Sequence, residues 1–124
     1  MSAAAKERRE TLLVIDNDEV FAKVLATALK KKGFRALTST NMDETLRLLR
    51  NESPNKAIID LRLGTTSGLQ FLPILKASNP DIQIVVLSGF STLETAATAL
   101  RLGACHYLTK PVDTDEIVAA FSQA

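Results

Sequence analysis

The sequence contains one cysteine, no tryptophan and one tyrosine in 124 residues. The single thiol, Cys105, excludes an intrachain disulfide and fits a cytoplasmic setting. No internal repeat or low-complexity segment is present. The first ten residues are charged and have no apolar stretch, so we expect a flexible tail at residues 1–10 and neither a signal peptide nor a membrane span.

The chain also lacks an excess of charge of either sign. Fifteen lysines and arginines oppose fourteen acids, so nothing in the net charge of +1 points to nucleic acid or a membrane surface as a partner. Hydrophobic residues make up 46% and charged residues 23%, as in an ordinary soluble domain. The length suffices for one domain with a sizeable core, which we place at residues 11–124.

Apolar runs and helical patterns alternate along the chain. Strands are expected at residues 11–16, 34–38, 56–60, 82–88 and 104–109. Helices are expected at residues 20–29, where Gly33 follows as a stop, and at 42–52, 68–78, 93–102 and 114–122. Pro73 should bend or weaken the helix that contains it.

N-terminal caps precede the helical segments. Asp18 is expected to cap the first helix. Each of the other four helices begins with the spacing of a capping box, in which Glu or Gln follows the cap residue by three positions. These pairs are Asn41 and Glu44, Ser67 and Gln70, Ser91 and Glu94, and Asp113 and Glu116. Four such matches at independently predicted helix starts support the assignment.

Strict alternation of strand and helix predicts an α/β fold with a parallel sheet and helices on both faces. The runs LLVI, AII and IVVL are apolar without alternation, as strands buried on both faces are. Residues 35–38 are less apolar, as expected of an edge strand. We therefore predict a doubly wound sheet of five strands in the order 2-1-3-4-5.

Polar residues stand where the predicted strands end. Asp16 ends the first strand and is followed by Asn17, Asp60 ends the third, Ser88 ends the fourth, and Lys110 follows the fifth. Open parallel sheets bind ligands at the carboxyl ends of their strands, so these side chains should meet in one crevice. Carboxylate and amide oxygens suit Mg²⁺, whereas an ammonium and a hydroxyl suit phosphate oxygens. A carboxylate beside bound Mg²⁺ can be the nucleophile toward a phosphoryl group.

Four motifs, VIDND, IIDLRLGTTSGL, VVLSGF and YLTKP, resemble the receiver domain of two-component response regulators in their order and separation, over residues 11–122. The resemblance implies a CheY-like form of the flavodoxin-like fold. The segments GACHYLTKPVD and SGLQFL look most like the RegA/PrrA/ActR type, which carries a C-terminal Fis-like helix-turn-helix. The chain contains no such segment, so we expect a stand-alone receiver or a chain cut after the domain, without direct nucleic-acid binding.

The resemblance assigns the metal and phosphate chemistry to individual residues. It implies that Asp60 is the phosphoacceptor and that Mg²⁺ is the cofactor. Asp60 and Asn17 would bind the metal directly, Asp16 through a water molecule, and Arg62 through its backbone carbonyl. Lys110 would pair with the phosphoryl group. Family members usually carry an acid at the position of Asn17, so this chain departs from the pattern there.

The resemblance also implies which residues act in the conformational switch and which set the lifetime of the phosphorylated state. Ser88 would bond a phosphoryl oxygen, and the Tyr107 ring would move inward on activation. The side chains of Arg62 and Phe90 would flank the path of the hydrolytic water and so tune the lifetime. The peptide bond before Pro111 would be cis.

The expected partner is a sensor histidine kinase, which would phosphorylate the domain. The domain would not turn over a substrate as an enzyme does, although it would catalyse its own phosphotransfer and dephosphorylation. The face formed by residues 93–102, 104–109 and 114–122 would control a downstream output, which the resemblance indicates to be transcription. Phosphorylation would permit homodimerisation, and no membrane partner is expected.

Other classes of protein use the same fold or the same chemistry. A flavodoxin-like cofactor binder needs a phosphate loop rich in glycine and hydroxyls after the first strand, where this chain has Asp18 and Glu19. A haloacid-dehalogenase-type phosphatase needs a second acid two residues after Asp60, where Arg62 stands. A phosphorylation-deficient pseudo-receiver that acts as an interaction module is the remaining alternative, and Asn17 is its only support.

Three residues near the fifth strand have simpler interpretations. Cys105 is expected to pack in the core, and His106 is expected to be structural or exposed. Tyr107 could be a packing residue on an edge strand instead of part of a switch.

Overall fold

Five parallel strands form the central sheet of the computed structural model, which describes residues 10–63, 66–89 and 92–122. They lie in the order β2-β1-β3-β6-β7, which confirms the predicted order 2-1-3-4-5. The strands are β1 (Thr11–Ile15), β2 (Arg35–Ser39), β3 (Lys56–Asp60), β6 (Gln83–Ser88) and β7 (His106–Thr109). The helices are α2 (Glu19–Lys31), α3 (Met42–Glu52), α4 (Phe71–Ser78), α5 (Leu93–Arg101) and α6 (Thr114–Ser122).

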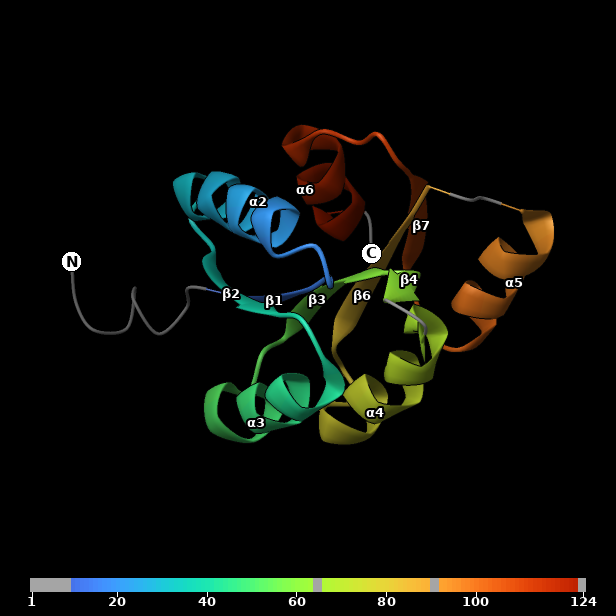
Figure 1. Ribbon diagram of the computed structural model, residues 1–124, viewed down its shortest axis with the longest axis horizontal. Coiled ribbons are helices and arrows are strands. Elements are labelled where there is room, and N and C mark those ends of the chain that lie inside the picture. Colours follow the sequence, from blue (N-terminus) through green and yellow to red (C-terminus); the bar gives the residue numbers. More distant parts are fainter. Residues whose placement is uncertain (1–9, 64–65, 90–91, 123–124) are drawn as a thin grey trace.

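Helices cover both faces of the sheet, with α2 and α6 on one side and α3 and α4 on the other (Figure 1). Successive side chains of β1 therefore enter two different cores, because neighbouring residues of a strand point to opposite faces. Leu13 and Ile15 are buried among side chains of α3 and α4, whereas Leu12 and Val14 are buried among side chains of α2 and α6. This arrangement explains why residues 12–15 of β1 are all apolar and why the next polar side chain, Asp16, appears only after β1 ends.

Four of the predicted N-terminal cap residues are confirmed, three at α-helices and one, Ser67, at the 3₁₀ turn described below. Asp18 caps α2 by accepting a hydrogen bond from the backbone N–H of Phe21 at 3.0 Å. Asn41 and Asp113 accept from the N–H group three residues further on, at 2.8 and 2.9 Å. The Glu116 carboxylate completes the capping box at Asp113, since it accepts from the Asp113 N–H at 3.3 Å. The box at Asn41 is not completed, because the Glu44 carboxylate accepts from the N–H of Thr40 instead, at 2.8 Å.

The predicted capping box at Ser91 and Glu94 is wrong by one residue. The cap of α5 is Thr92, whose hydroxyl accepts a hydrogen bond from the N–H of Thr95 at 3.1 Å. The Thr95 hydroxyl accepts from the N–H of Thr92 at 3.2 Å. A threonine thus takes the place of the usual Glu or Gln, and Ser91 lies outside the described residues.

Residues 68–78 form two elements and not the single helix that we predict from the sequence. A 3₁₀ turn, η1 (Gly68–Gln70), precedes α4, and the hydroxyl of Ser67 accepts from the N–H of Leu69 at 3.2 Å. Pro73 lies in the first turn of α4, where backbone N–H groups lack an intrahelical partner. The ring therefore removes little from the helix at this position.

The remaining differences lie at element ends and in one short hairpin. β2 runs one residue later than predicted, and β7 begins two residues later. The two-residue strands β4 (Arg62–Leu63) and β5 (Thr66–Ser67) form an antiparallel pair after β3. Strands this short leave no periodicity in the sequence, so no pattern predicts them.

The described part of the chain begins at Glu10, so residues 1–9 of the predicted tail lie outside it. Glu10 itself contacts the sheet. Its carbonyl accepts from the N–H of Arg35 at 2.9 Å, and its carboxylate lies 2.7 Å from the Lys56 ammonium. Within the described ranges, no helix combines the length and the apolar character that a membrane crossing requires.

Candidate functional site

The carboxyl ends of β1, β3 and β7 bring three charged side chains together. Asp16 directly follows β1, Asp60 is the last residue of β3, and Lys110 directly follows β7. Lys110 Nζ lies 3.4 Å from Asp16 Oδ2 and 3.6 Å from Asp60 Oδ2. Residues far apart in the sequence thus form one cluster at the edge of the sheet, where ligands of this fold class bind.

Asp16 is the inner carboxylate of this cluster. Its side chain is only 2% exposed, and its Oδ1 atom accepts a hydrogen bond from the N–H of Asp18 at 2.9 Å. Burial raises the pKa of Asp16, and the negative charge of Asp60 adds to that increase. The hydrogen bond from Asp18 and the charge of Lys110 oppose the increase without cancelling it. The cluster therefore has more negative charge than Lys110 alone compensates, and an additional cation would stabilise it.

Asp60 is the outer carboxylate, with 14% of its side chain exposed. The chain beyond it returns close to its backbone, where the N–H of Gly68 donates a hydrogen bond to the carbonyl of Leu61. A Cβ atom at Gly68 would clash with the backbone carbonyl oxygen of Asp60. Glycine is therefore required at residue 68, a role that is not predicted from the sequence motif that contains it.

Ser88 is the last residue of β6, between the strands that carry Asp60 and Lys110. Its side chain is buried, and its backbone carbonyl accepts a hydrogen bond from the N–H of Lys110 at 2.8 Å. The peptide bond between Lys110 and Pro111 is cis, as predicted. Ser88 and Lys110 are thus connected through the backbone next to the carboxylate cluster.

Tyr107 lies on β7, below the cluster and against α5. Its hydroxyl is 3.2 Å from the Thr95 hydroxyl of α5, and its ring packs half-buried against the core that includes Ala99. Tyr107 thus links β7 to α5. The contact suits either a packing residue or a residue that moves with α5.

The remaining predicted site residues are Asn17, Arg62 and Phe90. Asn17 is exposed beside Asp16, and Arg62 begins β4 two residues after Asp60. Phe90 lies outside the described residues. In the described ranges, no three side chains of His, Cys, Asp or Glu are grouped as metal ligands.

The donor set of the site nevertheless fits Mg²⁺. Asp16 and Asp60 supply carboxylate oxygens beside one another, and the backbone and Asn17 can add neutral oxygens. A hard divalent cation with several retained waters prefers such oxygen ligands, with one or two carboxylates. The increase in the pKa of Asp16, caused first by burial and then by Asp60, also indicates a place where positive charge is favourable.

Phe21 is a further neighbour of the cluster. From the sequence it is predicted only as part of the apolar face of a helix. The centroid of its ring lies 4.3 Å from Lys110 Nζ. An aromatic residue in the first turn of the helix that follows an acidic strand end is the signal that the sequence offers. That signal is weak, because such a residue more often packs in the core.

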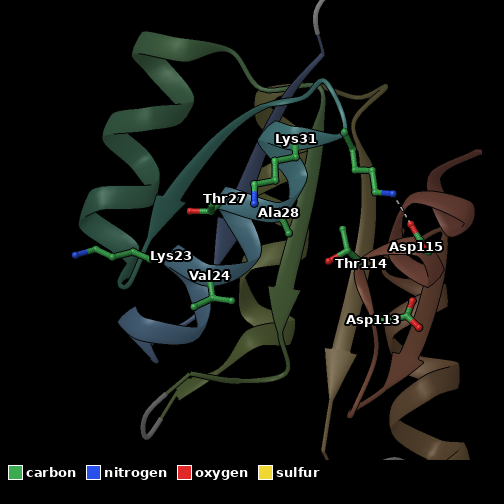
Figure 2. A pocket seen from close by; sticks show the side chains of 9 residues that line it. Lys23, Val24, Thr27, Ala28, Lys31, Asp113, Thr114 and Asp115 are labelled. Atoms are coloured by element: carbon green, nitrogen blue, oxygen red, sulfur yellow. Dashed lines mark ion pairs between the residues drawn. The ribbon is translucent and has the colours of Figure 1, made fainter.

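A groove of about 860 Å³ lies between α2 and α6, away from the carboxylates. Figure 2 shows Val24, Thr27 and Ala28 on one side of it and Thr114 and Asp115 on the other. Neither of the clustered carboxylates lines this groove. It is therefore an adjoining surface and not the site itself.

Cys105 is half-buried next to β7. Its thiol is 3.2 Å from the carbonyl oxygen of Ile84, to which it can donate, and burial raises the pKa of the thiol. The thiolate is the reactive form of cysteine, so these surroundings favour a packing role. The side chain also contacts the core beneath α6, in agreement with the expectation.

Comparison with known proteins decides the family. Residues 12–122 match the response regulator receiver domain, which is most of the chain. The chain belongs to this family. It is therefore a receiver domain of a two-component response regulator, a signalling domain and not a classical enzyme, as predicted. The match does not favour the pseudo-receiver alternative.

Two curated relatives show the more specific similarity of this chain to the RegA and ActR type. The acid tolerance regulatory protein ActR of Sinorhizobium medicae (strain WSM419) is 37% identical over 114 residues, which are 92% of this chain and 59% of that protein. The photosynthetic apparatus regulatory protein RegA of Cereibacter sphaeroides is 39% identical over 110 residues, which are 89% of this chain and 60% of that protein. The likeness to the RegA and ActR type is confirmed, and the chain spans about 60% of the length of these relatives.

Two solved structures support the fold. A response regulator protein from Burkholderia pseudomallei, with a phosphorylated aspartic acid, a calcium ion and citrate, has a TM-score of 0.85 and 40% identity, and the match covers 90% of this chain and 65% of that one. A CheY-like receiver domain protein from Methanospirillum hungatei JF-1 has a TM-score of 0.85 at 23% identity, over 93% of this chain and 92% of that one. The second supports the fold alone.

Proposed function

We propose that Asp60 accepts a phosphoryl group from a sensor histidine kinase in the presence of Mg²⁺. The observation that carries the proposal is the position of Lys110 Nζ, 3.4 Å from Asp16 and 3.6 Å from Asp60. The cluster combines an accessible carboxylate with an ammonium that can pair with a phosphoryl oxygen. Receiver domains interact with sensor histidine kinases, which supports this donor.

The transfer is a displacement at phosphorus. A carboxylate oxygen of Asp60 forms a bond to phosphorus while the bond from phosphorus to the kinase histidine nitrogen breaks, and the electron pair leaves with that nitrogen. Lys110 holds one phosphoryl oxygen, and the Ser88 hydroxyl bonds another in the product. Hydrolysis later returns Asp60 to the free carboxylate.

Four groups of the chain would hold Mg²⁺. They are the Asp60 carboxylate and the Asn17 amide, directly, the Asp16 carboxylate, through water, and the backbone carbonyl of Arg62. When bound, the metal neutralises negative charge between the carboxylates and the incoming phosphoryl group. The buried and crowded state of Asp16 supports this assignment, as does the calcium ion in the Burkholderia pseudomallei protein, which also contains a phosphorylated aspartic acid.

The switch would pass from Ser88 to the face formed by α5, β7 and α6. Ala99 is the only residue of α5 that is fully buried, whereas Leu93 is 89% and Leu100 is 49% exposed. A helix with so little buried contact can move at small energetic cost. Movement of Ser88 toward the phosphoryl group would free space for Tyr107, whose hydroxyl contacts α5.

The output of the whole protein is proposed from its relatives. RegA and ActR are named as regulatory proteins and are longer than this chain, so we propose transcription as the output, through a segment outside residues 11–124. Homodimerisation on phosphorylation, with the exposed leucines of α5 at the contact, is part of the same proposal.

The kinase would approach over the first turns of α2. Val20 and Val24 are 73% and 65% exposed on this helix, and Asp16 lies just before it. Exposed apolar side chains on the helix that follows Asp16 suit a protein phosphodonor.

Incubation with acetyl phosphate and Mg²⁺, followed by Phos-tag gel electrophoresis, tests the proposal. Wild-type protein should show a retarded band that disappears on chelation of the metal before the reaction, and Asp60→Ala should show none. Asp81→Ala removes an exposed carboxylate elsewhere and should behave as the wild type. A band of full intensity in Asp60→Ala would contradict the proposal.

A further inference from the structure

The ammonium group of Lys110 has a third neighbour besides the two carboxylates. Its nitrogen lies 4.3 Å from the centroid of the Phe21 ring, which comes from the first turn of α2. A cation within about 6 Å of the face of an aromatic ring is attracted by the quadrupole of the ring. The contact brings α2 into the cluster formed by the strand ends.

The carboxylates alone hold Lys110 loosely. The distances of 3.4 and 3.6 Å to Asp16 and Asp60 exceed the ~2.7–2.9 Å of a charge-assisted hydrogen bond. A lysine ammonium is strongly hydrated and sits on a flexible four-carbon stem, and this side chain is 26% exposed. Solvated conformations that leave the site are therefore open to Lys110 unless another contact opposes them.

Hydrogen bonds connect the backbone of Phe21 to the same site. Asp16 accepts the N–H of Asp18 with Oδ1 at 2.9 Å, and the Asp18 carboxylate accepts the N–H of Phe21 at 3.0 Å. The other oxygen of Asp16 faces Lys110, which lies over the ring. Asp16, Asp18, Phe21 and Lys110 are thus each in contact with the next, and Lys110 with Asp16 again. The Phe21 ring also packs against the core beneath α2 and α6.

We propose that Phe21 is a positioning residue for phosphotransfer, because its ring holds the Lys110 ammonium at the edge formed by Asp16 and Asp60. The kinetic consequence rests on the proposed function, whereas the contact between ring and ammonium does not. Without the ring, Lys110 spends less time where a phosphoryl oxygen arrives, so transfer slows although the acceptor and the metal ligands remain.

The test compares ring-free and ring-containing side chains at residue 21. Phe21→Leu removes the ring and keeps apolar bulk, Phe21→Met is a second ring-free variant, and Phe21→Tyr keeps the ring. Phe34→Leu is the matched control, because Phe34 is a half-buried ring of the same core that precedes β2, at the opposite edge of the sheet. Amide spectra establish that each variant is folded.

Two readouts are needed. The first is the NMR signals of the Lys110 ε-methylene in the metal-free protein, which the ring current of Phe21 should shift from the values of exposed lysines. The second is the rate of phosphorylation by acetyl phosphate, measured at several Mg²⁺ concentrations. We expect Phe21→Leu to lose the shift and to react about three- to tenfold more slowly at every Mg²⁺ concentration. Phe21→Tyr should keep the shift of the Lys110 signals and the phosphorylation rate of the wild type. Phe34→Leu should change neither the shift nor the rate.

Unchanged Lys110 signals in Phe21→Leu and Phe21→Met would overturn the inference. Phosphorylation that is slowed as much in Phe34→Leu as in Phe21→Leu would also overturn it, because it would indicate a general effect on packing. A wild-type protein that takes no label contradicts the proposed function instead. In that case the Lys110 signals still decide whether the ring holds the ammonium.

Discussion

Asp16 and Asp60 face the same ammonium group at 3.4 and 3.6 Å, but the Asp60 side chain is 14% exposed whereas that of Asp16 is 2% exposed. Burial, and next the negative charge of Asp60, raise the pKa of the inner carboxylate, Asp16. The outer carboxylate is the one that a phosphodonor can approach. The two acids therefore suit different tasks, support of a metal for Asp16 and acceptance of a phosphoryl group for Asp60.

The first prediction concerns stability without metal. The folded state raises the pKa of Asp16 above 3.8, so folding favours the protonated form. The contribution of Asp16 to the unfolding free energy should therefore fall as the pH rises from about 3.8 through the pKa of Asp16 in the folded protein. Asp16→Asn should lack this loss and should be more stable than the wild type at about pH 7. Urea unfolding in chelator at several pH values measures the difference.

Asp81→Asn is the control for this experiment, because Asp81 is exposed and far from the cluster in sequence. It should follow the wild type at all pH values. Addition of Mg²⁺ should stabilise the wild type more than Asp16→Asn. If Asp16→Asn loses stability at about pH 7 relative to the wild type in chelator, the conclusion that burial and Asp60 disfavour the charged form of Asp16 is incorrect.

The second prediction concerns the amide at residue 17. The Asn17 side chain can offer an oxygen to Mg²⁺ but no charge, so Asn17→Asp should bind the metal more tightly. A unit charge at ~4 Å is worth about 4 kcal/mol at an effective dielectric of roughly 20, before desolvation is subtracted. We expect a net gain on the order of 1–2 kcal/mol, about tenfold in affinity. Titration of Mg²⁺ with a fluorescence or NMR readout measures it.

Stability without metal and the Mg²⁺ dependence of phosphorylation also test whether residue 17 is a direct metal ligand. Asn17→Asp adds a carboxylate to a cluster in which burial and Asp60 already raise the pKa of Asp16. The variant should therefore be less stable than the wild type in chelator and should phosphorylate at lower Mg²⁺ concentration. Equal Mg²⁺ affinities in the two proteins would show that residue 17 is not a ligand.

The third prediction concerns the switch. Beryllofluoride with Mg²⁺ mimics a phosphoryl group on Asp60, and Ser88 should move toward it. Amide NMR signals from Ser88 to Leu108 should shift far more than those of α2, because α5 has one buried residue whereas α2 has four. Uniform shifts over the whole domain, or none, would count against a switch through α5 and Tyr107.

The fourth prediction concerns the lifetime of the phosphorylated state. Hydrolysis needs a water molecule in line with the bond between Asp60 and phosphorus. Phe90 is bulky and offers no hydrogen bond to that water, so Phe90→Glu should dephosphorylate faster than the wild type. Decay of label after removal of the phosphodonor, followed on Phos-tag gels, gives the two rates. Identical rates would exclude a role for Phe90.

Much of the fold could be predicted because it depends on local patterns. The unbroken apolar runs of β1, β3 and β6 identify strands that are buried on both faces, and alternation with helices fixes a parallel arrangement. Asp16, Asp60 and Lys110 could be predicted as a cluster for the same reason, since all three stand at the carboxyl ends of strands.

The features that the sequence analysis missed depend on the approach of segments in space. The contact of Phe21 with Lys110 requires the Lys110 side chain, which follows β7, to come close to the first turn of α2. The need for glycine at residue 68 comes from the return of the chain to Asp60. The cap at Thr92 replaces the predicted Ser91 because Thr95 can complete the box as well as Glu94. The spacing of residues in the sequence does not show which of the two neighbours, Ser91 or Thr92, is the cap.

The most direct test of the central claim is the chemical identification of the phosphorylated residue. Reduction with borohydride converts an aspartyl phosphate to homoserine, and peptide mapping by mass spectrometry locates it after treatment with acetyl phosphate and Mg²⁺. The account predicts homoserine at residue 60 alone, and none when Mg²⁺ is removed by chelator before the phosphodonor is added. Homoserine at Asp16 or at another acid, with residue 60 unchanged, would contradict it.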